Sequence, residues 1–97
     1  MSDERVAIVT GGSSGIGRAV AERLLESGYR VEICARDGSK LESAAAELAG
    51  KGEIAARATD VSDPAEARAL VEDALERWGR IDGVVNAHGV IGNFFKL

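Results

Sequence analysis

Apolar residues are distributed along the chain in two alternating patterns. The run Val6–Val9 is short, continuous and followed by glycines, which favours a buried strand over a helix. Residues 16–27 instead carry Ile16, Val20 and Leu24 four positions apart, which predicts an amphipathic helix with these three side chains on its inner stripe. A strand followed directly by a helix is therefore the first predicted unit.

The same alternation continues through the middle of the chain. Gly28 is typical of a helix C-terminus, and the run over residues 31–35 predicts a second strand. A second helix is expected over residues 39–49 and a third, less hydrophobic strand over residues 53–61. The inner face of the second helix is predicted from its apolar spacing to carry Leu41, Ala44, Ala45 and Leu48.

A third helix has clear start and stop signals. Asp63 is a suitable N-cap, Pro64 suits the first helical position, and Glu66 completes a D-x-x-E capping box, while Gly79 ends the helix. A fourth strand is expected over residues 81–87. The residues of the third helix that we expect to point inward are Ala67, Leu70, Val71, Ala74, Leu75 and Trp78.

The order β-α-β-α-β-α-β predicts an α/β fold of the doubly wound, Rossmann-like kind, with a parallel sheet in the order 3-2-1-4. Residues 1–89 form the expected domain, and residues 90–97 show no clear period and are expected to be an irregular tail. The fold is then truncated before its fifth strand, so the edge of the fourth strand is expected to be open. An open edge invites pairing with another chain, so we expect either a homodimer through that edge or marginal stability.

Composition narrows the classes of function. The chain has 97 residues, 45% of them hydrophobic, and a net charge of −4, which argues against a general nucleic-acid binder. The polar N-terminus does not resemble a signal peptide, and no apolar run approaches the ~20 residues of a membrane helix, so no membrane association is expected. The single cysteine, Cys34, fits a reducing compartment, and we expect a cytoplasmic location.

Glycines gather where the first strand meets the first helix. A helix N-terminus has unpaired N–H groups and a partial positive charge, so it can hold a pyrophosphate if no Cβ atom blocks the approach. We expect Gly11 to permit the turn, Gly15 to admit the phosphates and Gly17 to allow the helix to pack closely on the strand, with two serines as further donors. These residues are Gly11, Ser13, Ser14, Gly15 and Gly17. The alternative is a flexible turn that binds nothing.

Three motifs resemble the short-chain dehydrogenase/reductase family, classical type. Residues 10–17 resemble its T-G-x-x-x-G-I-G signature, including Ile16, and Asp60-Val61 resembles the acidic position after the third strand, which in the family contacts adenine. Asn86 and Gly89 fit the family's Asn-Asn-Ala-Gly motif after the fourth strand. The resemblance covers nearly the whole chain and implies a dinucleotide-binding, oxidoreductase-related domain.

The last motif departs from the family pattern at two positions. Ala87 stands where a second asparagine is usual, and His88 stands where alanine is usual. His88, the only histidine, is either a titratable group near the cofactor ribose or a tolerated substitution at a strand end.

The end of the second strand points to NADP(H) rather than NAD(H). A carboxylate there would bind both ribose hydroxyls of NAD, but the family position is occupied by Ala35. Arg36 follows it and can hold a 2′-phosphate in a bidentate manner. NAD(H) remains the alternative, because an arginine after a strand is often only a solvated charge.

The resemblance also implies catalytic residues that this chain does not contain. The family uses a tyrosine, a lysine four residues later and an earlier serine, whereas the single tyrosine, Tyr29, is followed at that spacing by Ile33. We therefore expect no catalytic residues in this chain, and no metal site either, because the sequence contains no cluster of metal-ligating residues. Three hypotheses follow: the nucleotide-binding part of an oxidoreductase, a stand-alone non-catalytic nucleotide-binding module, or a structural module with a vestigial loop.

Overall fold

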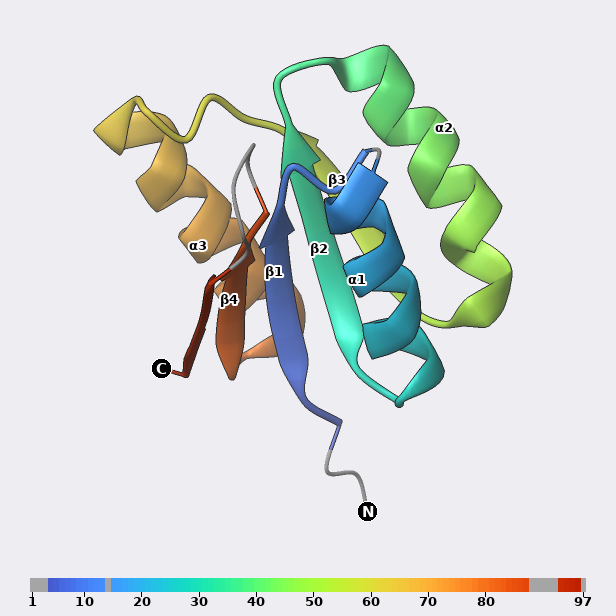
Figure 1. Cartoon of the computed structure of the whole chain (residues 1–97). Coiled ribbons are helices and arrows are strands. Elements are labelled where there is room, and N and C mark those ends of the chain that lie inside the picture. The colour runs from blue at the N-terminus through green and yellow to red at the C-terminus, as the bar shows by residue number, and fades with distance from the viewer. Residues whose placement is uncertain (1–3, 14, 88–92, 97) are drawn as a thin grey trace.

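The chain forms one five-stranded sheet with helices on both faces, as a computed structural model of residues 4–13, 15–87 and 93–96 shows (Figure 1). Its elements in chain order are β1 (Val6–Thr10), α1 (Gly15–Glu26), β2 (Arg30–Ala35), α2 (Gly38–Leu48), a 3₁₀ turn (Ala49–Lys51), β3 (Ile54–Ala58), α3 (Pro64–Trp78), β4 (Gly83–Asn86) and β5 (Asn93–Lys96). The predicted α/β class and element order are thereby confirmed as far as β4.

Strand order confirms the predicted topology and adds a strand to it. The sheet runs β3-β2-β1-β4-β5, with β1 parallel to both β2 and β4 and β2 parallel to β3. β5 pairs antiparallel with β4, Val84 lying opposite Phe95. The prediction of an open edge at β4 is therefore wrong, and self-association through that edge has no unpaired β4 backbone to use.

Part of the expected tail is thus a strand. Residues 93–96 continue the sheet, although their sequence shows no obvious period, because an antiparallel neighbour can return beside β4 after a short connection. The predicted domain boundary after Gly89 lies outside the described residues, as does His88.

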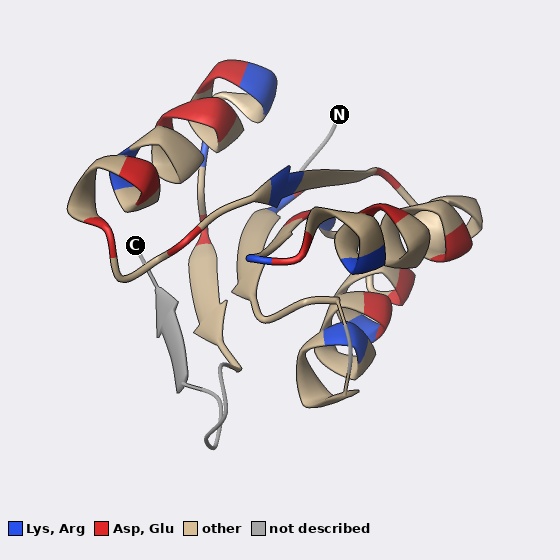
Figure 2. Cartoon of the chain, turned by 90° about the horizontal axis from the view of Figure 1, so that it is seen from above, with Lys and Arg blue, Asp and Glu red and all other residues tan. Residues whose placement is uncertain are grey.

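Helices divide between the two faces of the sheet (Figure 2). α1 and α2 lie on one side and α3 on the other. The larger core lies under α1 and α2 and includes Val9, Ile33 and Leu41, all at most 1% exposed. The smaller core lies under α3 and joins Ile8 and Cys34 of the sheet to two residues of the helix, Leu70 and Ala74.

The inner stripe of α1 lies one position further along than predicted. Its buried residues are Gly17, Ala21 and Leu25, whereas Ile16 is 62% exposed. Val20 and Leu24 are only half-buried and flank the larger core. The stripe shifts because Gly17, which has no side chain, faces the backbone of the loop after β1 and lets the start of the helix come close to it.

The inner face of α2 is close to the prediction, and that of α3 is narrower. Leu41, Ala44 and Leu48 are buried, with Ala45 half-buried against the same core. On α3, Leu70 and Ala74 are buried and Ala67 and Trp78 half-buried. The remaining two of its predicted inward residues are exposed, by 37% for Val71 and 44% for Leu75.

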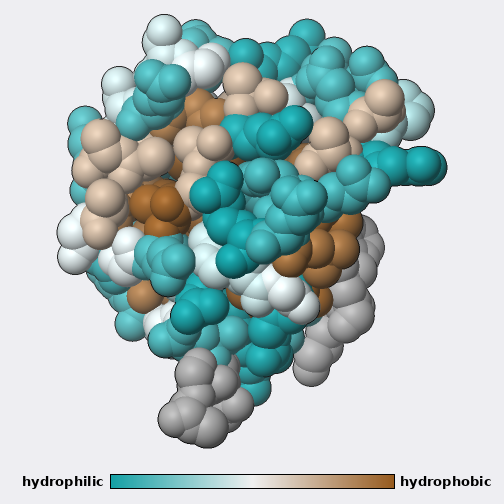
Figure 3. All heavy atoms as spheres, turned by 180° about the vertical axis from the view of Figure 1, so that it is seen from behind, coloured by the Kyte–Doolittle hydropathy of each residue, from teal (hydrophilic) through white to brown (hydrophobic). Residues whose placement is uncertain are grey.

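α3 leaves apolar side chains exposed on its side of the sheet. Figure 3 shows the molecule from the side that carries α3, where hydrophobic patches lie among polar side chains. α3 is the one helix on this face among the described residues, so the side of its apolar stripe that turns away from the sheet has no neighbour there.

Caps at the helix ends follow the sequence signals with one change. Asp63 accepts a hydrogen bond from the amide of Ala65 (2.9 Å), and Gly79 ends α3 with a φ of 78°. Glu66 reaches past the predicted capping-box partner, because its Oε1 accepts from the amide of Asp60 (2.8 Å). The cap of α3 is thus tied to the loop that follows β3.

Truncation of Leu25 tests the corrected position of α1. Leu25→Ala should lower the free energy of unfolding by roughly 2–5 kcal/mol, because it empties a buried site. Ile16→Ala should change it by less than ~1 kcal/mol, because its side chain is mostly exposed. Urea denaturation of both variants measures the two free energies of unfolding. Equal losses would contradict the observed stripe and favour the one predicted from the sequence.

Candidate functional site

The carboxyl ends of three parallel strands meet at one level of the sheet. Thr10 at the end of β1 lies opposite Cys34 of β2 and Asn86 of β4. β1 is the central strand: β2 and β3 lie on one side of it and β4 on the other, so the direction of strand addition reverses there. In open α/β sheets, ligands bind in the crevice at such a point.

The glycine-rich loop turns sharply at the end of β1. Gly11 has a φ of 72°, a conformation that favours glycine. The amides of Gly11 and Gly12 both donate to the carbonyl of Cys34, at 2.8 and 3.2 Å. The loop is thereby bound to β2 by its own backbone, and the role predicted for Gly11 in the turn is supported.

Gly17 fixes where the helix begins. A Cβ atom at this position would lie 2.0 Å from the carbonyl oxygen of Gly11 and 2.6 Å from its carbonyl carbon. No side chain fits there, because the obstacle is backbone. The first turn of α1 therefore lies directly on the loop, a closer contact than the predicted packing on the strand.

Gly12 is a further constrained glycine that the sequence analysis did not single out. A Cβ atom here would lie 2.7 Å from the Cβ and Cγ2 atoms of Ile33 in the larger core. Its position directly after Gly11, in a strand-to-helix turn, was the signal in the sequence that could have identified it. The residue that it faces, Ile33, becomes known only from the pairing of β1 with β2.

Gly15 differs from these glycines because it faces open space. Its φ is 61°, and a Cβ atom there would meet nothing within 4 Å. The beginning of α1 is therefore accessible to a ligand from outside, with amides that a helix leaves without intrahelical partners. An anion that contacts this backbone would occupy the space in which a side chain would lie, which fits the predicted diphosphate site.

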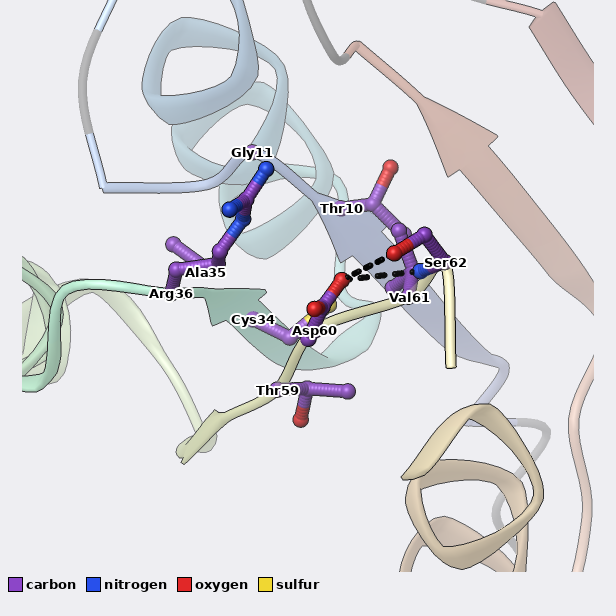
Figure 4. Close-up of a pocket in the computed structure, with 9 residues that line it drawn as sticks. All are labelled: Thr10, Gly11, Cys34, Ala35, Arg36, Thr59, Asp60, Val61 and Ser62. Atoms are coloured by element: carbon purple, nitrogen blue, oxygen red, sulfur yellow. Dashed lines mark hydrogen bonds between the residues drawn. The ribbon is translucent and has the colours of Figure 1, made fainter. Parts of the chain in front are cut away.

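A pocket lies beside the glycine loop (Figure 4). Four of its lining residues were predicted, namely Gly11, Arg36, Asp60 and Val61. The others are Thr10, Cys34, Ala35, Thr59 and Ser62. The pocket gathers the ends of β1, β2 and β3, so residues distant in sequence become neighbours.

The walls of the pocket are held by local hydrogen bonds. Asp60 Oδ1 accepts from the amide of Ser62 (3.0 Å) and from its hydroxyl (2.6 Å). Thr59 is 4% exposed, and its amide donates to the carbonyl of Ala35 at 2.8 Å. Burial raises the pKa of the Cys34 thiol to about 12, and the electrostatic effect of Glu32 adds to the rise. The thiol is therefore neutral where it lines the pocket.

Arg36 is the cation at the rim of this pocket. In Figure 4 its side chain extends from the end of β2 on the side of the pocket where Gly11 lies. The adjacent Asp37 carboxylate caps α2 by accepting from the amides of Ser39 (3.0 Å) and Lys40 (3.2 Å). Ala35 contributes no carboxylate at the pocket, so the strand end presents a guanidinium.

The remaining predicted residues lie around this centre. Ser13 lines a separate shallow pocket with Arg18, which forms an ion pair with Glu47. Ile16 lies exposed in the first turn of α1. Ser14 and Gly89 lie outside the described residues.

On the other side of β1, a threonine joins the strand ends. Thr10 Oγ1 donates to Asn86 Oδ1 (3.0 Å), and the amide of Ala87 donates to the carbonyl of Thr10 (3.3 Å). Asn86 therefore ties β4 to β1, and Ala87 takes part through its backbone alone.

Comparison with known proteins identifies the family. The profile described as "short chain dehydrogenase" matches residues 5–96, so the chain belongs to this family, as its motifs predicted. The chain spans about a third of the length of the curated relatives that it matches.

Similar proteins include a sequence relative and two solved structures. A putative ketoacyl reductase 1 of the granaticin polyketide synthase of Streptomyces violaceoruber is 46% identical over 90% of this chain and 32% of its own length. An actinorhodin polyketide ketoreductase with NADPH superposes with a TM-score of 0.86 at 42% identity, covering 91% of this chain and 34% of that one. A short-chain dehydrogenase/reductase from Burkholderia phymatum in complex with NAD gives 0.81 at 35% identity, over 84% and 30%.

No helix in the described part of the chain is long and apolar enough to cross a membrane. Within the same part, no group of three or more histidine, cysteine or acidic side chains is arranged to hold a metal ion.

Substitution of Gly17 tests the contact on which the loop depends. Gly17→Ala should lower the free energy of unfolding by roughly 2–4 kcal/mol, because its methyl group would meet the Gly11 carbonyl. Gly50→Ala is the matched control, since a Cβ atom there meets nothing within 4 Å. Thermal unfolding of the two variants should separate them, and an unperturbed Gly17→Ala would refute the contact.

Proposed function

We propose that this chain is the NADP(H)-binding part of a short-chain dehydrogenase/reductase. The observation that carries the proposal is the open backbone at Gly15 beside a pocket whose rim presents Arg36 in place of a carboxylate. The pocket is lined by Gly11 of the same loop, so the two features adjoin, as the diphosphate and the adenosine of one dinucleotide require.

Each part of the cofactor has residues to hold it. The diphosphate would lie at the start of α1 near Gly15 and Gly17, with Ser13 and Ser14 as further donors. The adenosine would enter the pocket beside Asp60 and Val61. A 2′-phosphate would pair with the guanidinium of Arg36, since a planar fork of donors matches a phosphate.

The nicotinamide end would extend towards β4. Asn86 and Ala87 stand at its carboxyl end, on the other side of β1 from the pocket, and Gly89 follows in the proposed motif. The bound nicotinamide would supply hydride transfer. The residues of this chain bind and orient the cofactor.

Similar proteins support NADP(H) as the preferred cofactor. Two of the similar structures hold NADPH, the actinorhodin ketoreductase and an L-sorbose reductase from Gluconobacter frateurii, while the Burkholderia phymatum protein holds NAD. NAD(H) is therefore the second candidate, bound through the same loop without the phosphate contact.

Turnover is not expected of this chain alone. Tyr29 lies half-buried against the larger core, with Ile33 rather than a lysine four residues further on. We propose that the chain binds NADPH without oxidising it, and that catalysis belongs to a longer protein. Its free, buried Cys34 suits a cytoplasmic location, which we also propose.

Replacement of Arg36 tests the cofactor preference. Arg36→Gln should weaken NADPH binding by roughly 10- to 100-fold, because a charge-assisted phosphate contact is lost. NADH binding should change by less than about twofold, since it lacks the phosphate. Titration of nicotinamide fluorescence measures both affinities.

Arg68→Gln, an exposed change on α3, is the matched control for the loss of one positive charge. Equal losses for NADPH and NADH in Arg36→Gln would contradict the specificity, and absence of binding at millimolar dinucleotide would leave only a structural role for the chain.

A further inference from the structure

A carboxyl group lies buried in the middle of the sheet. Glu32 of β2 is 0% exposed, and neither of its carboxyl oxygens has a hydrogen-bond partner among the described residues. Its strand neighbours Val31 and Ile33 face the larger core, so Glu32 faces the other side, with Cys34 and α3. An ionised carboxylate in such a place is costly, which favours the neutral acid.

The groups that face Glu32 come from three elements. α3 contributes Asp73 and Arg77, β3 contributes Arg57, and β2 itself contributes Cys34. Two arginines form ion pairs with Asp73: Arg77 Nη2 lies 3.1 Å from Asp73 Oδ2, and Arg57 Nη1 lies 4.0 Å from Oδ1. The two arginines form ion pairs with Asp73, whereas they act on Glu32 only through their charge, which lowers its pKa by less than burial raises it.

Two carboxyl groups beside one another take different protonation states. Burial raises the pKa of Glu32 to about 8, and interaction with Asp73 adds to the effect. The pKa of Asp73 is lowered by its interaction with Glu32 and by Arg77 and Arg57. The two groups interact without a hydrogen bond of ordinary geometry, as a neutral acid next to a carboxylate.

The position of α3 on the sheet is coupled to the pocket. Glu66, in the first turn of α3, accepts from the amide of Asp60 at 2.8 Å, and Val61 packs against the same small core as Leu70. Cys34, two residues from Glu32 on the same face of β2, lines the pocket itself. A shift of α3 would therefore move the Asp60–Val61 wall.

We propose that Glu32 is a proton-controlled latch: as a neutral acid it allows α3 to pack against β2, and loss of the proton loosens α3 together with the Asp60–Val61 wall. Deprotonation would place a carboxylate that is buried from water next to the partly buried carboxylate of Asp73, and the two like charges would repel. The effect on folding rests on the structure alone, whereas the effect on the pocket also rests on the proposed function.

The sign of the pH dependence follows from the proton count. Between pH 4.5, the ordinary pKa, and about pH 8, the folded chain holds a proton on Glu32 that the unfolded chain has lost. The contribution of Glu32 to stability is therefore full below pH 4.5 and is lost as the pH rises to about 8.

Glu32→Gln tests the latch, because an amide imitates the neutral acid and cannot ionise. We compare the melting temperature of the variant with that of the unmodified chain from pH 5 to pH 9. As the pH rises, the melting temperature of the variant should increase relative to that of the unmodified chain, by roughly 10 °C at pH 9. The difference between the two melting temperatures should stop growing above about pH 8. Glu72→Gln, an exposed change on α3, is the control and should parallel the unmodified chain.

Parallel melting curves for Glu32→Gln and the unmodified chain would overturn the proposal. If Glu32→Gln does not fold, carbon-13 NMR of the glutamate carboxyl groups in the unmodified chain decides the question. One glutamate titrating near pH 8 supports the latch, and titration of every glutamate below pH 6 overturns it.

NADPH titration at pH 7 and pH 9 tests the coupling to the pocket. Affinity should fall at least threefold with rising pH in the unmodified chain and stay level in Glu32→Gln. An equal fall in both would overturn the coupling. Absence of NADPH binding at either pH would refute the proposed function, while the melting curves would still decide the latch.

Discussion

The contact between Gly17 and the carbonyl of Gly11 is the constraint on which the site depends. A Cβ atom at residue 17 would lie 2.0 Å from that oxygen, so the start of α1 can approach the loop only with glycine there. The same loop is bound to β2 through the carbonyl of Cys34. These backbone contacts direct the unpaired amides of the helix towards the crevice at the end of β1, where Gly15 leaves the approach open.

The two faces of the sheet are unequal, and this inequality shapes the rest of the molecule. Under α1 and α2 the core is broad and wholly apolar, as Val9, Ile33 and Leu41 show. Under α3 it is small and contains the buried carboxyl group of Glu32. The face with the larger apolar core therefore holds the glycine loop, while the second face positions the pocket wall and contains the group that we propose responds to pH.

Much of this arrangement could be predicted from the sequence, because it depends on local patterns. Glycine spacing, the Asp63-Pro64 helix start and the alternation of apolar runs determined the order of elements and the parallel sheet. The family motifs also located Arg36 and Asp60, which the structure places in one pocket.

The rest depends on contacts between distant residues. Ile16 fits a helical stripe by its spacing, but the close approach allowed by Gly17 turns the next position inward. Val71 and Leu75 also have the right spacing, yet nothing in the described chain covers that side of α3. Thr59 and Ser62 join the pocket only because β1, β2 and β3 end at one level, and β5 is defined by its pairing with β4 rather than by its own pattern.

The most direct test of the central claim is a titration of the nitrogen-15-labelled chain with NADPH, followed by backbone amide NMR. The amides of Gly11, Gly12, Gly15 and Gly17 should shift most, together with those around Arg36 and Asp60. Saturable binding that leaves the glycine-loop amides unshifted would contradict the account.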